Sequence, residues 1–317
     1  MKKILYPLII IIVSCNVLIA QKFKKVETII KSNNPLEISP NLNFEINTNI
    51  DSTIISKETF KKIKIIQPLI EKEENKEALD IFNTIDEKDL QKNELLILKG
   101  TIELKLDYLS DSYNSFSKYI LVTPNDSIKS SIYYCLGIID LKRDLKISAF
   151  NNFKKSYELD NKNNSSVISL GVMSENRKEI ENAVFYYKIA VKNNPNLNNV
   201  WNNLAFMYQK TEKHKKANEI LNKIIKDEPD SPLPYSNRSY SNLKLGNTKQ
   251  ALIDINKSLS LFSENSYAFR NRSLIYLKLK EFEKACNDIE MAIKLGFKEK
   301  YGSELDILKL ENCKKRI

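Results

Sequence analysis

The chain has 317 residues, of which 42% are apolar and 28% are charged, and it contains only six Gly and nine Pro. Doubly wound sheets and barrels need many turns and glycine-rich phosphate loops, so this composition argues against both and favours helices. Four Cys and one His leave little material for a metal site. The net charge of +10 comes from Lys and Glu that are interleaved along the chain. That pattern is typical of solvated helix faces, so we expect no nucleic-acid partner.

Residues 1–20 have the pattern of a bacterial secretion signal, with two lysines before an apolar run and a polar sequence after it. We favour cleavage after Ala20, which makes 1–20 a signal peptide and releases a soluble chain. Residues 12–15 also resemble a lipobox, in which case the signal ends at 14 and Cys15 is lipidated. A third alternative is an uncleaved, rather short membrane anchor. Each of the three predicts export, to the periplasm or the cell exterior, with membrane attachment only through a lipid or the signal itself.

Residues 21–58 show no sustained helical period and contain clusters of Asn, Ser and Pro. This composition predicts an extended or disordered leader. Pro68 then makes the first helix of the following region doubtful, because proline breaks or restarts a helix.

From about residue 59 the sequence repeats itself. Five of the eleven alanines are each 34 residues apart: Ala149, Ala183, Ala217, Ala251 and Ala285. Leucine, glycine and aromatic positions follow the same period. A fixed period of this length indicates a helical repeat protein, in which each unit buries its apolar face only against its neighbours.

The repeating residues resemble those of the tetratricopeptide (TPR) repeat. The unit 198–231 carries the pattern most completely, with Trp201, Leu204, Ala205, Tyr208, Ala217, Leu221, Ile224 and Pro229. Five such units fill 130–299, and degenerate units fill 59–129. Two units depart from the pattern, because Arg238 and Arg272 stand at the repeat position that Leu204 occupies in the unit 198–231. The resemblance implies an all-α fold, a right-handed α-solenoid of helical hairpins, with a capping helix and tail at 300–317 that turns Leu305, Leu308 and Leu310 inward.

Candidate chemistry is sparse. The sequence has no Walker loop, HExxH, GxSxG or zinc-type cysteine pairs. His214 lies in a predicted turn and is expected at the surface. We therefore predict a protein that is not an enzyme and has no cofactor or metal. Because neighbouring helices of a TPR stack run antiparallel, Cys286 and Cys313 should meet and can form a disulfide, or remain two buried thiols. Cys135 is then unpaired.

By resemblance, the first helices of the units line a concave groove. Asn203, Asn237 and Asn271 recur at one repeat position in consecutive units. Their amides could pair with an extended peptide backbone. The basic and aromatic residues expected beside them are Lys210, Lys244, Lys278, Arg270, Phe206, Tyr240 and Tyr267. This groove would favour a protein or peptide partner with acidic character.

The sequence therefore predicts a non-catalytic protein–protein interaction scaffold of the bacterial cell envelope or exterior, binding an extended peptide or a protein surface in the groove. The alternative is a structural or assembly component of an envelope complex that docks through its convex face or the leader. The sequence does not specify the partner, the pathway or the oligomeric state.

Overall fold

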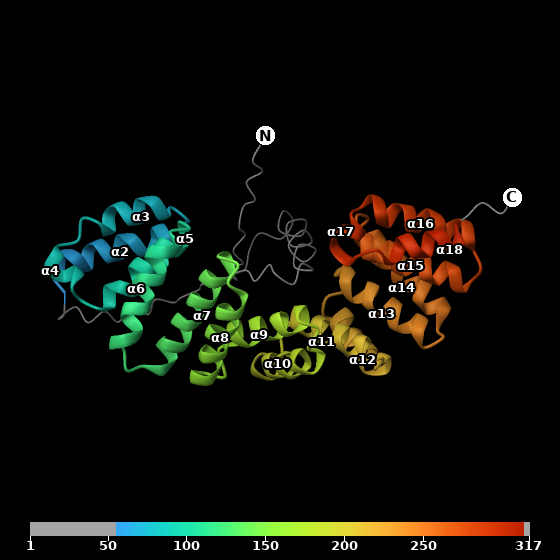
Figure 1. Cartoon of the computed structure of the whole chain (residues 1–317), viewed down its shortest axis with the longest axis horizontal. Coiled ribbons are helices and arrows are strands. Elements are labelled where there is room, and N and C mark those ends of the chain that lie inside the picture. Colours follow the sequence, from blue (N-terminus) through green and yellow to red (C-terminus); the bar gives the residue numbers. More distant parts are fainter. Residues whose placement is uncertain (1–54, 314–317) are drawn as a thin grey trace. The chain divides into compact units, whose positions relative to one another are not determined.

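The computed structural model describes residues 55–313, so the predicted signal, its candidate lipidation site Cys15 and most of the predicted leader lie outside the described residues. Within this range the chain is helical without a strand, and its helices pack as consecutive hairpins (Figure 1). The predicted all-α TPR-type fold is confirmed. The described residues fall into two compact units, here called the N-terminal array (55–170) and the C-terminal array (171–313), and the boundary lies inside one helix.

The N-terminal array begins earlier than the predicted residue 59. Its helices are α2 (Lys57–Glu71), α3 (Asn75–Phe82), α4 (Glu87–Leu90), α5 (Glu94–Lys105), α6 (Leu109–Val122), α7 (Asp126–Lys142), α8 (Lys146–Leu159) and the first part of α9 (Asn164–Asn176). Ser56 caps α2 and donates its hydroxyl to Asp89 of α4 at 2.7 Å. Pro68 lies inside α2 without ending it. Because a proline near the end of a helix removes only one hydrogen bond, the last turn survives.

Helix α7 is 17 residues long, whereas α11, α13 and α15 have 13 each. It starts at Asp126, where the sequence has a three-residue insertion before the 34-residue frame resumes, and the Asn125 side chain caps it by accepting from the amide of Ile128. The insertion therefore lengthens a helix instead of opening a loop, because an Asn cap satisfies an amide that would otherwise lack a partner.

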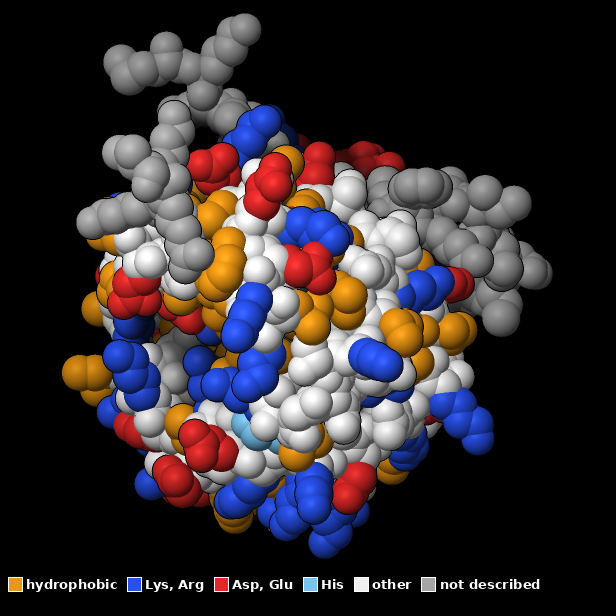
Figure 2. All heavy atoms as spheres, turned by 90° about the vertical axis from the view of Figure 1, so that its right-hand side faces the viewer, with side chains coloured by type: hydrophobic (Ala, Val, Ile, Leu, Met, Phe, Trp, Pro, Cys, Tyr) orange, Lys and Arg blue, Asp and Glu red, His pale blue; other side chains and the backbone are white. Residues whose placement is uncertain are grey.

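The C-terminal array contains the rest of α9 and its partner α10, followed by three further hairpins and a cap. Its helices are α10 (Ile180–Asn193), α11 (Asn198–Lys210), α12 (His214–Asp227), α13 (Pro232–Lys244), α14 (Thr248–Leu261), α15 (Ser266–Lys278), α16 (Phe282–Lys294), α17 (Phe297–Tyr301) and α18 (Glu304–Asn312). On the face in Figure 2, basic, acidic and hydrophobic side chains are interspersed, in line with the interleaving in the sequence.

The repeated alanines lie where the helices of a hairpin cross. All five are fully buried: Ala149, Ala183, Ala217, Ala251 and Ala285. At one crossing, the Ser239 hydroxyl of α13 donates to the carbonyl of Ala251 in α14 at 2.8 Å. A larger side chain at such a place would separate the two helices. The prediction that small residues mark helix contacts is confirmed.

The turn inside each hairpin uses a left-handed residue. Non-glycine residues hold a positive φ in most of these turns: Glu73, Asp107, Asp144, Lys178, Glu212 and Lys280. Only one hairpin has glycine there, Gly246 with a φ of 83°. The chain thus builds its repeat turns with few glycines, which agrees with the low Gly content and requires tertiary packing to hold the strained conformation.

The C-terminal cap differs from the single capping helix and tail predicted at 300–317. Gly302, with a φ of 92°, separates α17 from α18. Phe297 and Leu305 are buried against α16, and Leu308 packs there in part. Leu310 was expected to face inward but is 62% exposed. Among the described helices, none is both long and apolar enough to cross a membrane.

Candidate functional site

An aromatic–basic cluster lies on the first helices of three successive hairpins. It consists of Phe206 and Lys210 of α11, Tyr240 and Lys244 of α13, and Tyr267 and Arg270 of α15. In each of the first two helices a lysine lies over the ring one turn before it, with 5.0 Å from the Lys210 Nζ to the Phe206 centroid and 5.5 Å from the Lys244 Nζ to the Tyr240 centroid. The Phe206 and Tyr267 rings meet edge to face at 6.5 Å.

The two lysines of the cluster are available to a ligand. Lys210 and Lys244 are exposed, and neither has an ion-pair partner in the described part of the chain. Their rings are half-buried and hold the lysine stems along an apolar surface. Lys278, predicted to extend the series, is exposed at the end of α15 and takes no part in these ring contacts.

Arg270 is the buried member of the cluster, 9% exposed. Its guanidinium lies 5.3 Å from the Tyr240 centroid and 5.7 Å from the Tyr267 centroid, so two rings hold it. It donates from both Nε and Nη2 to the carboxylate of Glu304 in α18, and from Nη1 to the Asn271 side chain at 3.0 Å. Bidentate pairing of this kind is stronger and more directional than a single ion pair.

The cap contributes an aromatic ring as well. Tyr301 of α17 lies 5.3 Å from Tyr267 and 4.9 Å from Phe297 between ring centroids. Burial raises the pKa of Tyr267 to about 12 and that of Tyr301 to about 12, so both hydroxyls stay protonated and uncharged at neutral pH. Sequence reasoning missed Tyr301 and Glu304, because the cap lies outside the repeat period.

His214 was expected at the surface but is 9% exposed. It is the first residue of α12, and its ring lies edge to face with Tyr240 at 6.0 Å. Burial, together with the nearby charge of Lys244, lowers its pKa. The positive charge of the cluster at neutral pH therefore comes from lysine and arginine.

The three asparagines are placed differently from the expected ladder. Asn237 is 7% exposed and donates to Asn202 of the preceding hairpin at 3.0 Å. Asn271 is 1% exposed and donates to Ser236, likewise one hairpin earlier. Only Asn203 is half-buried. Asn237 and Asn271 therefore join neighbouring hairpins instead of presenting free amides to a peptide.

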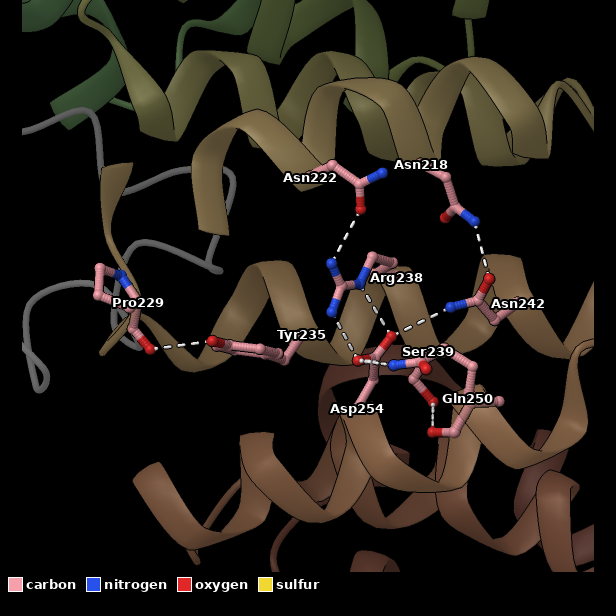
Figure 3. A network of polar contacts seen from close by, with 10 residues as sticks. Asn218, Asn222, Pro229, Tyr235, Arg238, Ser239, Asn242, Gln250 and Asp254 are labelled. Carbon is pink, nitrogen blue, oxygen red and sulfur yellow. Dashed lines mark hydrogen bonds and ion pairs between the residues drawn. The ribbon is translucent and has the colours of Figure 1, made fainter. Parts of the chain in front are cut away.

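The two arginines that depart from the repeat pattern occupy equivalent polar networks. Arg238 pairs with both carboxylate oxygens of Asp254, at 2.9 and 2.7 Å, and also donates to Asn222 (Figure 3). One hairpin later, Arg272 pairs with Asp288 at 2.7 and 2.8 Å and donates to Asn256. In both networks the aspartate is almost fully buried. The arginine–aspartate pairs join the two helices of one hairpin, and the hydrogen bonds to Asn222 and Asn256 join that hairpin to the one before it.

The predicted cysteine pair lies within the same array. The structure contains a Cys286–Cys313 disulfide, with 5.7 Å between the Cα atoms, and it ties the end of α18 to α16. Cys135 is buried and free. Residues 55–313 contain no cluster of His, Cys, Asp and Glu that could hold a metal ion.

Residues 203–231 match the family model described as tetratricopeptide repeat. Two solved structures resemble most of the chain. One is the C-terminal part of a TPR repeat-containing protein from Cytophaga hutchinsonii, 15% identical, with a TM-score of 0.58, covering 76% of this chain and 98% of that one. The other is a TPR protein from Parabacteroides merdae, 16% identical, with a TM-score of 0.55, covering 80% of this chain and 100% of that one. No curated protein matches the sequence.

At these identities the likeness shows the fold alone. TPR proteins are generally non-catalytic scaffolds that bind peptides or proteins.

Proposed function

We propose that the chain is a non-catalytic interaction scaffold of the bacterial cell envelope or exterior, and that its C-terminal array binds an acidic peptide or protein segment. One observation carries the proposal: the aromatic–basic cluster presents a cation beside an aromatic ring on each of three successive first helices. Rings supply contact surface, and the unpaired lysines supply complementarity to carboxylates.

Two features support the location outside the cytoplasm. Residues 1–20 carry the signal pattern, and the cap contains a disulfide, a bond that persists in oxidising compartments. Measurement of the intact mass of the protein isolated from its native cells tests this part. A mature chain that starts at Gln21, or a lipidated one that starts at Cys15, supports export. An unprocessed chain in the cytosolic fraction contradicts it.

Reversal of charge tests the binding surface. We expect the full chain to bind an acetylated and amidated deca-glutamate peptide, and the variant Lys210→Glu/Lys244→Glu to lose that binding. The control Lys249→Glu/Lys257→Glu makes the same charge change on exposed positions of α14, away from the cluster. Fluorescence anisotropy at constant salt measures both. An equal effect of the two variants would show only a general charge effect and reject this surface.

The same variants test the function in the cell. Affinity capture from the native envelope should recover a protein partner with wild type and with the α14 control, but not with the cluster variant. If partners instead depend on residues 21–58 and are indifferent to the cluster, the chain docks through its leader and the proposed surface is rejected.

A further inference from the structure

The aromatic–basic cluster already holds a carboxylate, which belongs to the chain itself. Glu304, the first residue of α18, accepts two hydrogen bonds from the guanidinium of Arg270. The two partners differ in exposure, because the side chain of Arg270 is 11% exposed whereas that of Glu304 is 45% exposed. The guanidinium is thus fixed in the protein, and the carboxylate reaches it from the solvent side.

The arginine is positioned independently of Glu304. Tyr240 and Tyr267 lie against its guanidinium, and Asn271 accepts from its third nitrogen. These contacts come from α13 and α15 and do not involve Glu304. A preorganised guanidinium with two donors directed outward is a binding site for one carboxylate.

Glu304 contributes little that is specific to the fold of the cap. Other contacts attach α17 and α18 to the array: the buried Phe297 and Leu305, the ion pair of Lys309 with Glu290 of α16 at 3.1 Å, and the disulfide. A half-exposed carboxylate regains water readily when it leaves its partner, because little of its hydration has been lost. The cap can therefore stay attached while Arg270 exchanges one carboxylate for another.

We propose that Glu304 is an internal plug of a carboxylate subsite at Arg270, and that an acidic side chain of the bound segment displaces it. This inference deepens the proposed function and rests on it. The occupant is an internal run of Asp or Glu rather than a chain terminus. A terminal carboxylate pairs with one cation, whereas a run of acidic side chains can pair with Lys210, Lys244 and Arg270, which lie on three successive first helices.

Removal of the plug tests the proposal in the full chain, with the acetylated and amidated deca-glutamate peptide as the probe. We expect Glu304→Gln to bind it about tenfold more tightly than wild type, because the competing charge-assisted pair is gone. The matched control is Asp306→Asn, which removes one negative charge from the same helix, two residues away, where it pairs with Lys298 and not with Arg270. That control should change the affinity by less than about twofold.

A second variant assigns the gain to Arg270. Adding Arg270→Gln to Glu304→Gln should abolish the gain, and circular dichroism melting with an intact disulfide by mass confirms that the cap remains folded. Equal gains in Glu304→Gln and Asp306→Asn, or no gain in either, overturn the plug. In either case loss of binding in Lys210→Glu/Lys244→Glu still supports the proposed function, so the two failures are distinguishable. If neither wild type nor any variant binds the acidic peptide, both the subsite and the acidic partner are rejected.

Discussion

The hairpins of the two arrays fill the same crossing with different chemistry. In α5–α6 and α7–α8 of the N-terminal array, Gly100 and Gly137 face Phe116 and Phe153, and a Cβ on either glycine would come within 2.9 and 2.5 Å of the ring. The C-terminal array keeps this pairing at its start, where Gly171 faces Tyr187, but in α13–α14 and α15–α16 the equivalent repeat positions hold Ser239 with Ile255 and Ser273 with Ile289.

These pairs show that the side-chain volume at one repeat position compensates for the volume at the other. A large ring is paired with glycine, and a smaller aliphatic side chain with serine; the intermediate unit combines Ala205 with Leu221. Close packing requires the sum of the two volumes to stay nearly constant, so the position tolerates different residues only in matched combinations.

The arrays also differ in how they bury charge. Glu103 of the N-terminal array is 4% exposed and is held by Ser115 at 2.8 Å, with the Lys99 ammonium at 3.7 Å. The buried Asp254 and Asp288 of the C-terminal array each have a bidentate arginine. Burial raises the pKa of a carboxylate that has only a weak partner. A buried carboxylate with a strong partner stays charged, so the stability of its hairpin depends on that partner.

The largest effect is expected from breaking the Arg238–Asp254 pair. Arg238→Leu restores the repeat pattern but leaves Asp254 buried without its cation, which should lower the free energy of unfolding by roughly 3–5 kcal/mol. The double variant Arg238→Leu/Asp254→Ile introduces the Leu204 and Ile220 combination of the preceding unit and should recover most of the loss. Urea unfolding followed by Trp201 fluorescence measures both. A double variant as unstable as the single one would contradict the pairwise account.

The disulfide is expected to have the next largest effect. Cys313→Ser opens a link between residues 27 apart in sequence, which should lower the stability of the cap by roughly 2–4 kcal/mol. Proteolysis of the C-terminus measures the loss, with Cys135→Ser as the control, since Cys135 is a free thiol in the other array. Equal protection of wild type and Cys313→Ser would show that α18 is held by packing alone.

A smaller effect is expected at the glycine of the N-terminal array. Gly137→Ala should destabilise by roughly 1–3 kcal/mol, because Phe153 has to move from its packed position. The double variant Gly137→Ala/Phe153→Leu should regain stability, since it reproduces the Ala205–Leu221 pair of the C-terminal array. Thermal unfolding followed by circular dichroism measures the coupling free energy between the two substitutions. Additive effects of the two substitutions would argue against volume compensation.

The smallest effect concerns pH. Burial raises the pKa of Glu103 above its ordinary range, although the hydrogen bond from Ser115 opposes the shift. A carboxyl whose pKa is higher in the folded than in the unfolded protein stabilises the fold at pH values below the unfolded pKa. That contribution is lost as pH rises through the folded pKa. Glu103→Gln should therefore gain stability relative to wild type as pH rises from about 4 to 7. A stability difference independent of pH would place the Glu103 pKa at its ordinary value.

The sequence predicted the periodic features well, because a contact that recurs every 34 residues leaves the same residue type at each recurrence. The buried alanines and the hairpin order follow from that regularity, and the meeting of Cys286 with Cys313 follows from the antiparallel direction of neighbouring helices. The Arg238 and Arg272 networks had a signal that was overlooked: each arginine is followed 16 residues later by an aspartate.

Other features could not be predicted from the period. The contacts of Glu304 and Tyr301 involve a cap that is not a repeat, and the burial of Asn237 and Asn271 depends on how closely neighbouring first helices approach. The exposed lysines of the cluster were predicted, because repeat positions define faces of a helix. Which of those faces is covered by another part of the chain depends on packing at the end of the array, where the pattern stops.

Hydrogen–deuterium exchange of the full chain, with and without saturating deca-glutamate peptide, tests the central claim most directly. The account predicts that protection increases in α11, α13 and α15 around Phe206, Tyr240 and Tyr267, and that α14 is unchanged. Protection confined to other helices, or none at saturation, would contradict the claim that this cluster is the binding surface.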